Sequence, residues 1–160
     1  MTATIDTRRP PQRELVITRV FDAPRELVFK VWTDPQHAKH WWGPKHHPST
    51  HLEMDVRPGV AWRACLRSTE TGEDLWHGGV FREVVAPERI VFTFKWDDDG
   101  ERGIENLVTV TFAEQGGKTL MTLRQSPFQS GDECDGHQEG WNSTFDRLEE
   151  HLAHHSGSEP

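Results

Sequence analysis

Most of this chain reads as a succession of β-strands with no helix between them. From about residue 51 to residue 125, apolar and polar residues alternate in segment after segment, most clearly over residues 60–67, 90–96 and 108–112. A period of two is typical of half-buried antiparallel strands, whereas a parallel sheet needs a crossover helix after each strand. With a further strand at residues 14–21, the sequence predicts an antiparallel sheet of six or seven strands.

Two short helices are expected between the first strand and the rest of the sheet. The Asp-Ala-Pro at residues 22–24 and the Asp-Pro at residues 34–35 are helix-start signals, because Asp is a good N-cap residue and Pro fits the first turn. The Trp-Gly-Pro at residues 42–44 carries the glycine and proline that commonly end a helix. These signals predict one helix that starts from an Asp22 cap and a second helix directly after it.

One longer helix is expected at the C-terminal end. Ser130 and Glu133 have the spacing of a capping box, which marks a helix start. Apolar residues then recur on one helical face from Trp141 to Leu152. A face this apolar needs a large apolar partner, and the alternating strands supply one. The sequence therefore predicts an α+β fold in which the sheet packs on this helix.

The chain is expected to form one domain. Its 160 residues match the usual size of a single domain, and no repeat or long linker divides it. We expect disordered tails at residues 1–13 and 154–160, which are polar and lack periodicity, and a single folded unit at residues 14–153. The charged stretch at residues 97–103 is expected to be a hairpin loop.

Charge and composition exclude several classes of function. The formal net charge of −8 argues against a nucleic-acid binder, which needs basic surface. Cys65 and Cys134 are too few for a disulfide framework. The opening residues lack the apolar run of a signal peptide, and no stretch reaches the length of about 18 apolar residues that a membrane span requires. We therefore expect a cytoplasmic protein with no membrane span.

Four short stretches carry a resemblance to a known family. They are RVFDAPRE at residues 19–26, WWGP at 41–44, MDVRPG at 54–59 and GWN at 140–142. They resemble bacterial proteins named for the C-terminal domain of the activator of the heat-shock protein 90 ATPase, within the START and birch-pollen-allergen-like (SRPBCC) superfamily. The resemblance covers residues 14–152 and implies a helix-grip fold: a curved antiparallel sheet around the long C-terminal helix, with an internal cavity that receives apolar molecules in relatives.

Large aromatic residues are the strongest candidates for lining such a cavity. The chain holds seven Trp and eight Phe, and pockets for small molecules are mostly apolar with a few polar groups. Filling the core is the alternative role for these rings. We expect a small apolar or aromatic ligand to contact Trp42, Trp62, Phe81, Phe94, Trp96, His137, Trp141 and Phe145.

Two other functions remain open from the sequence. A cyclase- or hydrolase-like enzyme would place polar residues inside the cavity, and His77, Glu83 and His137 are the candidates for acid–base chemistry. A protein-interaction domain, such as a chaperone partner in a stress response, would expose an apolar patch near Trp41 and Trp42. We expect binding rather than catalysis, and the sequence is also compatible with a homodimer.

A group of histidines raises the question of a metal site. His37 and His40 share a helical face, and His46, His47 and His51 follow closely. Such a set could supply zinc ligands, but a HxxH pair alone is a weak signal. We therefore expect no metal and no cofactor, and interpret these residues as surface histidines that gain charge as the pH falls from about 7 to 5.

Overall fold

The computed structural model describes residues 13–97, 104–128 and 130–158 of the chain. The expected N-terminal tail, apart from residue 13, and the charged loop at residues 98–103 lie outside these residues. The elements follow in the order β1 (Arg13–Phe21), α2 (Arg25–Thr33), α3 (Pro35–Ala38), β2 (Ser49–Glu53), β3 (Ala61–Arg67), β4 (Asp74–Val85), β5 (Arg89–Trp96), β6 (Asn106–Gln115), β7 (Lys118–Phe128) and α4 (Gly131–Ser158).

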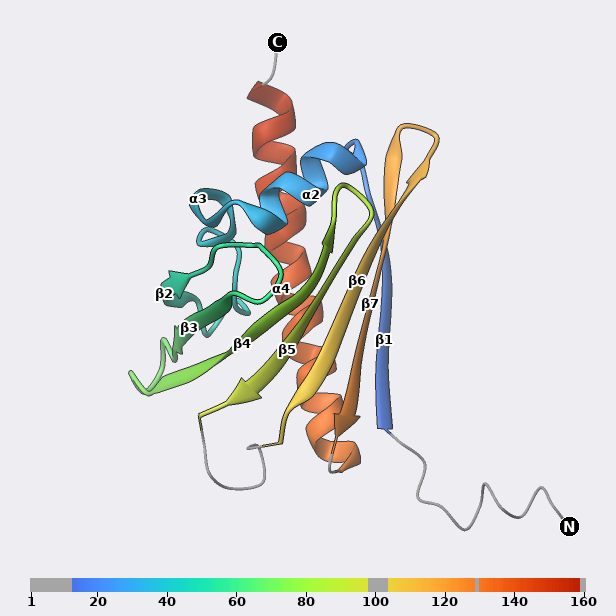
Figure 1. Ribbon diagram of the computed structural model, residues 1–160. Coiled ribbons are helices and arrows are strands. Elements are labelled where there is room, and N and C mark those ends of the chain that lie inside the picture. Colours follow the sequence, from blue (N-terminus) through green and yellow to red (C-terminus); the bar gives the residue numbers. More distant parts are fainter. Residues whose placement is uncertain (1–12, 98–103, 129, 159–160) are drawn as a thin grey trace, which may run out of the picture.

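The strands of the described residues form one seven-stranded antiparallel sheet, in the order β1-β7-β6-β5-β4-β3-β2. Each strand from β2 to β7 therefore pairs with the next along the chain, and β1 returns to pair with β7. The long helix α4 lies across one face of the sheet, and α2 and α3 lie beside its C-terminal half (Figure 1). The predicted α+β fold, with its curved sheet, long C-terminal helix and two short helices after β1, is confirmed.

The core lies between the sheet and α4. The apolar face of α4 that was predicted from Trp141 to Leu152 is buried. Trp32 of α2 fills the centre of the core, where its ring packs against Trp41 and Phe112 with centroids 4.9 and 6.2 Å apart. Helix α2 thus fills the space beside the C-terminal half of α4 and leaves the N-terminal half of that helix to other contacts.

The predicted helix starts hold for α3 and α4 but not for α2. Asp34 Oδ1 accepts a main-chain N–H at 2.9 Å at the start of α3. Ser130 Oγ accepts the N–H of Glu133 at 3.1 Å at the start of α4. The expected Asp22 cap is wrong, because Pro24 occupies the N-cap position of α2 and no side chain caps it.

Helix α3 is shorter than expected and α4 is longer. Helix α3 ends at Ala38, and Trp41 turns into the core, where its indole N–H donates to the carbonyl of Val31 at 3.0 Å. Gly43 has a φ of +98°, and a Cβ there would lie 2.5 Å from a main-chain oxygen, so this position needs glycine. Helix α4 continues to Ser158, into the stretch expected as a tail. None of the described helices is long and apolar enough to cross a membrane.

Candidate ligand-binding cavity

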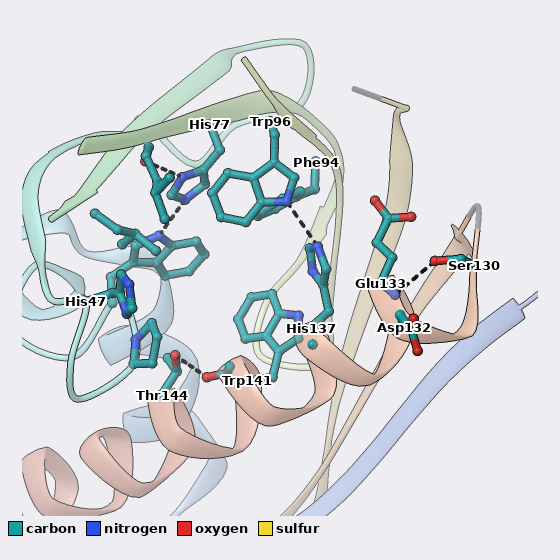
Figure 2. A pocket seen from close by; sticks show the side chains of 17 residues that line it. His47, His77, Phe94, Trp96, Ser130, Asp132, Glu133, His137, Trp141 and Thr144 are labelled. Atoms are coloured by element: carbon teal, nitrogen blue, oxygen red, sulfur yellow. Dashed lines mark hydrogen bonds between the residues drawn. The ribbon is translucent and has the colours of Figure 1, made fainter. Parts of the chain in front are cut away.

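A cavity of about 470 Å³ lies between the N-terminal half of α4 and strands β3, β4 and β5 (Figure 2). The loop between α3 and β2 borders it as well. Its volume falls within the range of roughly 300–1,000 Å³ that is typical of small-molecule sites. The described residues that line it are Trp42, Gly43, Pro44, His47, Leu66, Leu75, His77, Phe94, Trp96, Ser130, Asp132, Glu133, Gly136, His137, Gly140, Trp141 and Thr144.

Four aromatic side chains from distant parts of the chain meet at this cavity. Trp42 and Trp141 are perpendicular to each other, with ring centroids 5.7 Å apart. Phe94 and Trp96 form a similar edge-to-face pair with centroids 5.2 Å apart. Edge-to-face packing is a favoured arrangement of aromatic rings. The cavity therefore has a well-packed aromatic wall.

Two of the tryptophans donate hydrogen bonds to histidines. Trp42 Nε1 donates to Nε2 of His77 at 3.1 Å, and Trp96 Nε1 donates to Nε2 of His137 at 3.0 Å. Because an indole N–H is a donor only, each Nε2 must be an unprotonated acceptor, and each imidazole is therefore neutral with its proton on Nδ1. The two histidines thus orient the two rings that face the cavity.

His77 is neutral for a second reason, which is its burial. Its side chain is 1% exposed, and desolvation lowers its pKa from the ordinary 6.5 to about 4. Its Nδ1 lies 3.4 Å from the carbonyl oxygen of Leu75, which accepts the proton that Nε2 does not carry. With both ring nitrogens engaged inside the protein, His77 supports the cavity wall.

The third tryptophan is held by a buried amide chain that our sequence reasoning missed. Trp141 Nε1 donates to Gln125 Oε1 at 2.7 Å, and Gln125 Nε2 donates to Asn106 Oδ1 at 3.0 Å. Asn106 in turn donates to the carbonyl of Pro127. The sequence did indicate this series of amide hydrogen bonds. Gln125 continues the inward-facing positions of its strand, where a polar residue is unusual.

Arg147 of α4 ties down the loop that borders the cavity. Its guanidinium donates to the carbonyl oxygens of His40 at 2.9 Å, Gly43 at 2.7 Å and Trp42 at 3.3 Å. Partial burial lowers the pKa of Arg147, because desolvation disfavours its charged form. Together with Ser143, whose Oγ accepts the N–H of Lys45 at 2.9 Å, Arg147 holds the loop that carries Trp42 against α4.

Replacing Arg147 by alanine is expected to lower the free energy of unfolding by about 1–3 kcal/mol, because three carbonyl oxygens lose a charged donor. Arg124 is the matched control, since its exposed ion pair with Glu14, at 3.4 Å, should contribute less than about 1 kcal/mol. Urea denaturation of both alanine variants beside the wild type measures the difference. Equal losses in the two variants would contradict the role given to Arg147.

The expected ligand contacts divide into two groups in the structure. Trp42, Phe94, Trp96, His137 and Trp141 line the cavity. The remaining three do not border it: Trp62 and Phe81 line a separate hollow of about 10 Å³, and Phe145 is buried in the core. The ring of Trp62 packs against those of Trp42 and His77, whose centroids lie 5.6 and 5.5 Å from its own.

The polar residues proposed for acid–base chemistry are also dispersed. Glu83 forms a bidentate ion pair with Arg89, with both distances at 2.9 Å, and is not among the described residues that line the cavity. His77 has both nitrogens engaged. His137 lines the cavity, beside the rings of Phe94 and Phe128.

The apolar surface patch expected near Trp41 and Trp42 is absent at these residues. Trp41 is 0% exposed and Trp42 is 6% exposed. The exposed patch was expected only if the protein were a protein-interaction domain, whereas Trp42 was also expected to contact a ligand in the cavity. The patch does not form at these residues because the chain turns inward after Ala38, so that Trp41 packs against Trp32 and Trp42 reaches the cavity.

The histidine group expected at residues 37–51 does not meet at one point. His37 and His40 lie instead against His151 of α4: Nδ1 of His37 is 3.1 Å from Nε2 of His151, and the ring of His40 stacks on that of His151. His51 lies 3.2 Å from a carboxylate oxygen of Glu53. Across the described part of the chain, no three His, Cys, Asp or Glu side chains are arranged to hold a metal ion.

Solved bacterial structures share this fold. Protein CV1439 from Chromobacterium violaceum is 26% identical, with a TM-score of 0.79 and coverage of 85% of this chain and 94% of that one. The AHSA1 protein SPO3351 from Silicibacter pomeroyi is 26% identical, with a TM-score of 0.79 and coverage of 88% and 98%. Protein Ms6760 from Mycobacterium smegmatis is 24% identical, with a TM-score of 0.74 and coverage of 87% and 90%.

Comparisons with known sequences gave a match to one family profile and none to a curated protein. No curated protein sequence matches the chain significantly. The sequence profile of one family, described as "Activator of Hsp90 ATPase homolog 1-like protein", matches residues 22–153. That match runs from the residues before α2 into α4 and takes in most of the chain. With its helix-grip fold and this match, the chain belongs to the family of activator of Hsp90 ATPase homolog 1-like proteins, within the SRPBCC-type superfamily.

Proposed function

We propose that this protein binds a small apolar or aromatic molecule in the cavity beside α4, as a cytoplasmic sensor, carrier or sequestering protein. The observation that carries the proposal is the aromatic wall, in which the indole N–H groups of Trp42, Trp96 and Trp141 are all bonded within the protein. The rings therefore offer a ligand their carbon surface. A cavity held open in advance loses little conformational entropy on binding, and burial of apolar surface supplies the driving force.

The family supports the same proposal, since SRPBCC-type folds commonly bind hydrophobic ligands. The two rival functions have less support at this site. Of the three residues predicted for acid–base chemistry, His77 has both ring nitrogens engaged and Glu83 lies elsewhere, which leaves His137. A protein-interaction surface at Trp41 and Trp42 has less support, because both side chains are buried.

The first test is native mass spectrometry of freshly purified protein, followed by titration with lipids, flavonoids and polyketide-like aromatics. Binding should quench tryptophan fluorescence saturably, because Trp42, Trp96 and Trp141 line the cavity. The same native spectrum reports whether the protein forms a homodimer. A bare mass together with a flat titration across the panel would contradict the proposal.

A blocked cavity should abolish this binding while the fold is retained. Gly140 lines the cavity, and a Cβ at this position would meet nothing within 4 Å. Replacing Gly140 by leucine is therefore expected to weaken binding by more than about tenfold, or about 1.4 kcal/mol. Leucine is also a better helix former than glycine, so the variant should unfold at the same or a higher temperature.

The matched control places the same side chain on the other side of the helix. Gln138 is exposed and is not among the described residues that line the cavity. Gln138→Leu should bind with unchanged affinity. Equal affinity of Gly140→Leu and wild type would place the ligand outside this cavity.

A further inference from the structure

We propose that His47 and Thr144 form a polar end of the cavity, and that they bind a hydroxyl group on an otherwise apolar or aromatic ligand. This inference rests on the proposed function, because it concerns the same cavity. It adds a chemical class to the ligand, which is a phenol or another hydroxylated apolar compound. It also assigns the two residues that recognise the hydroxyl.

His47 has hydrogen-bonding groups that the protein itself does not use. The indole N–H groups of the three lining tryptophans are bonded within the protein, as are both ring nitrogens of His77 and Nε2 of His137. His47 lines the same cavity, and neither of its ring nitrogens bonds to any of the residues that the structure describes. A neutral imidazole offers one donor and one acceptor. The ring of His47 can therefore bond a polar group on a ligand.

The backbone on both sides of His47 is anchored to the β3–β4 hairpin. The carbonyl oxygen of His46 accepts the N–H of Thr69 at 3.0 Å, and the carbonyl oxygen of Pro48 accepts the N–H of Arg67 at 3.0 Å. His47 is half-buried, and its ring lies on the side of the cavity away from the start of α4 (Figure 2). Because the loop is already held in place, His47 loses little conformational freedom when it bonds a ligand.

Thr144 supplies a second polar group on the same side of the cavity. It lines the cavity and is 3% exposed. Its Oγ1 donates to the carbonyl oxygen of Gly140 at 2.8 Å, so that this hydroxyl can only accept a further hydrogen bond. Ser143 Oγ accepts the N–H of Lys45 at 2.9 Å, and the loop that carries His47 therefore contacts this turn of α4. Figure 2 shows both side chains on one side of the cavity.

A hydroxyl is the ligand group that matches this pair. It can accept a hydrogen bond from the imidazole N–H of His47 and donate its own proton to Thr144 Oγ1. An ether, ketone or carboxylate oxygen only accepts, and it would leave Thr144 unpaired. Moving a hydroxyl from water into an apolar cavity costs free energy unless it is bonded there. A site that bonds a hydroxyl therefore discriminates against an analogue that lacks it.

The test uses three uncharged probes with the same ring system: 2-naphthol, 2-methoxynaphthalene and 2-methylnaphthalene. The first donates and accepts a hydrogen bond, the second only accepts, and the third does neither. Calorimetric titration of the wild-type protein should give an affinity for 2-naphthol at least about fivefold higher than for 2-methylnaphthalene. The affinity for the ether should lie between these two values.

Substitutions locate the source of the preference. His47→Phe keeps an aromatic ring but removes both nitrogens, and it should reduce the ratio of the 2-naphthol and 2-methylnaphthalene affinities toward one. Thr144→Val removes the acceptor with little change of volume, and it should reduce the preference for 2-naphthol over the ether. His46→Phe is the matched control, because His46 is exposed and lies outside the described lining, and it should keep both ratios. Thermal unfolding verifies that each variant is folded.

The outcomes separate the two proposals. If the three probes and the wider ligand panel are all silent, the proposed function fails, and the polar end fails with it. If the probes bind with equal affinity, or if the preference survives in His47→Phe or in Thr144→Val, the cavity binds ligands but the hydroxyl recognition is wrong. If the panel alone yields a ligand, its affinity should fall in His47→Phe and not in His46→Phe. An unchanged affinity, or an equal loss in both variants, would overturn the inference.

Discussion

Replacing Gly79 by alanine is expected to lower the free energy of unfolding by about 4 kcal/mol or more, which is an exceptional loss for one methyl group. A Cβ on Gly79 would lie 1.9 Å from the carbonyl oxygen of Thr93 in the neighbouring strand. That oxygen is main chain, so no side-chain rotation can relieve the overlap. The same oxygen accepts the indole N–H of Trp62 at 3.0 Å, and a shift of the strand would also disturb this buried bond.

The local pairing of β4 and β5 explains why glycine stands here. The register pairs Gly78 with Lys95 and then Phe81 with Phe92, and between them the N–H of Val80 donates to Thr93 Oγ1 at 2.8 Å. The two strands therefore approach closely beside Gly79. At this point the hydroxyl of Thr93, rather than a main-chain carbonyl oxygen, accepts the N–H of Val80.

Gly136 provides the opposite control for this prediction. It lies in α4, and a Cβ there would meet nothing within 4 Å. Gly136→Ala should therefore raise the free energy of unfolding by about 0.5–1 kcal/mol, since alanine is the better helix former. Urea denaturation followed by circular dichroism compares the two variants. A Gly79→Ala protein within 1 kcal/mol of wild type would contradict the close approach described above.

Acidification is expected to destabilise the protein through His77. The pKa of His77 is about 4 in the folded protein, below its ordinary 6.5. Between these two values the unfolded chain binds a proton that the folded chain does not bind, so stability falls as the pH drops. Above pH 6.5, neutral His77 makes its full contribution to the free energy of unfolding. That free energy falls by about 3 kcal/mol once the pH has dropped through 4. Protonation of Nε2 would also break the bond from Trp42.

His77→Gln isolates this effect from the titration of carboxylates. A glutamine does not titrate, and its amide oxygen can still accept the indole N–H of Trp42. The variant should be less stable than wild type at pH 7.5, and the difference should shrink or reverse as the pH approaches 4. Denaturation curves at several pH values measure it. Parallel pH profiles for the two proteins would show that His77 is not the titrating group.

The fold followed from patterns that are local in the sequence. Alternation over β3, β5 and β6 predicted antiparallel strands, and the apolar spacing from Trp141 to Leu152 predicted a long helix packed on them. Both patterns show which side of a strand or helix is apolar. Residues that are close together in the sequence are enough to define that side. The prediction that Asp22 caps α2 was wrong. A cap depends on the path of the backbone before the helix, which the spacing of residues in the sequence does not reveal.

The cavity was predictable in part. Residues on the inward face of the sheet and helix could be named, and Phe94, Trp96 and Trp141 do border the cavity. Trp62 and Phe81 are buried as well, but they line a separate hollow of about 10 Å³. The periodicity of apolar residues distinguishes inward from outward positions. It does not show whether an inward side chain packs against another side chain or borders an empty cavity.

The sequence by itself determined the class of fold, the order of its elements and the large aromatic residues from which the cavity is made. The tertiary structure decided which rings line that cavity and how they are held. Trp42 meets His77 across 35 residues of sequence, and Trp96 meets His137 across 41. Such pairs form because the sheet and α4 bring distant segments together, and no local pattern in the chain encodes that approach.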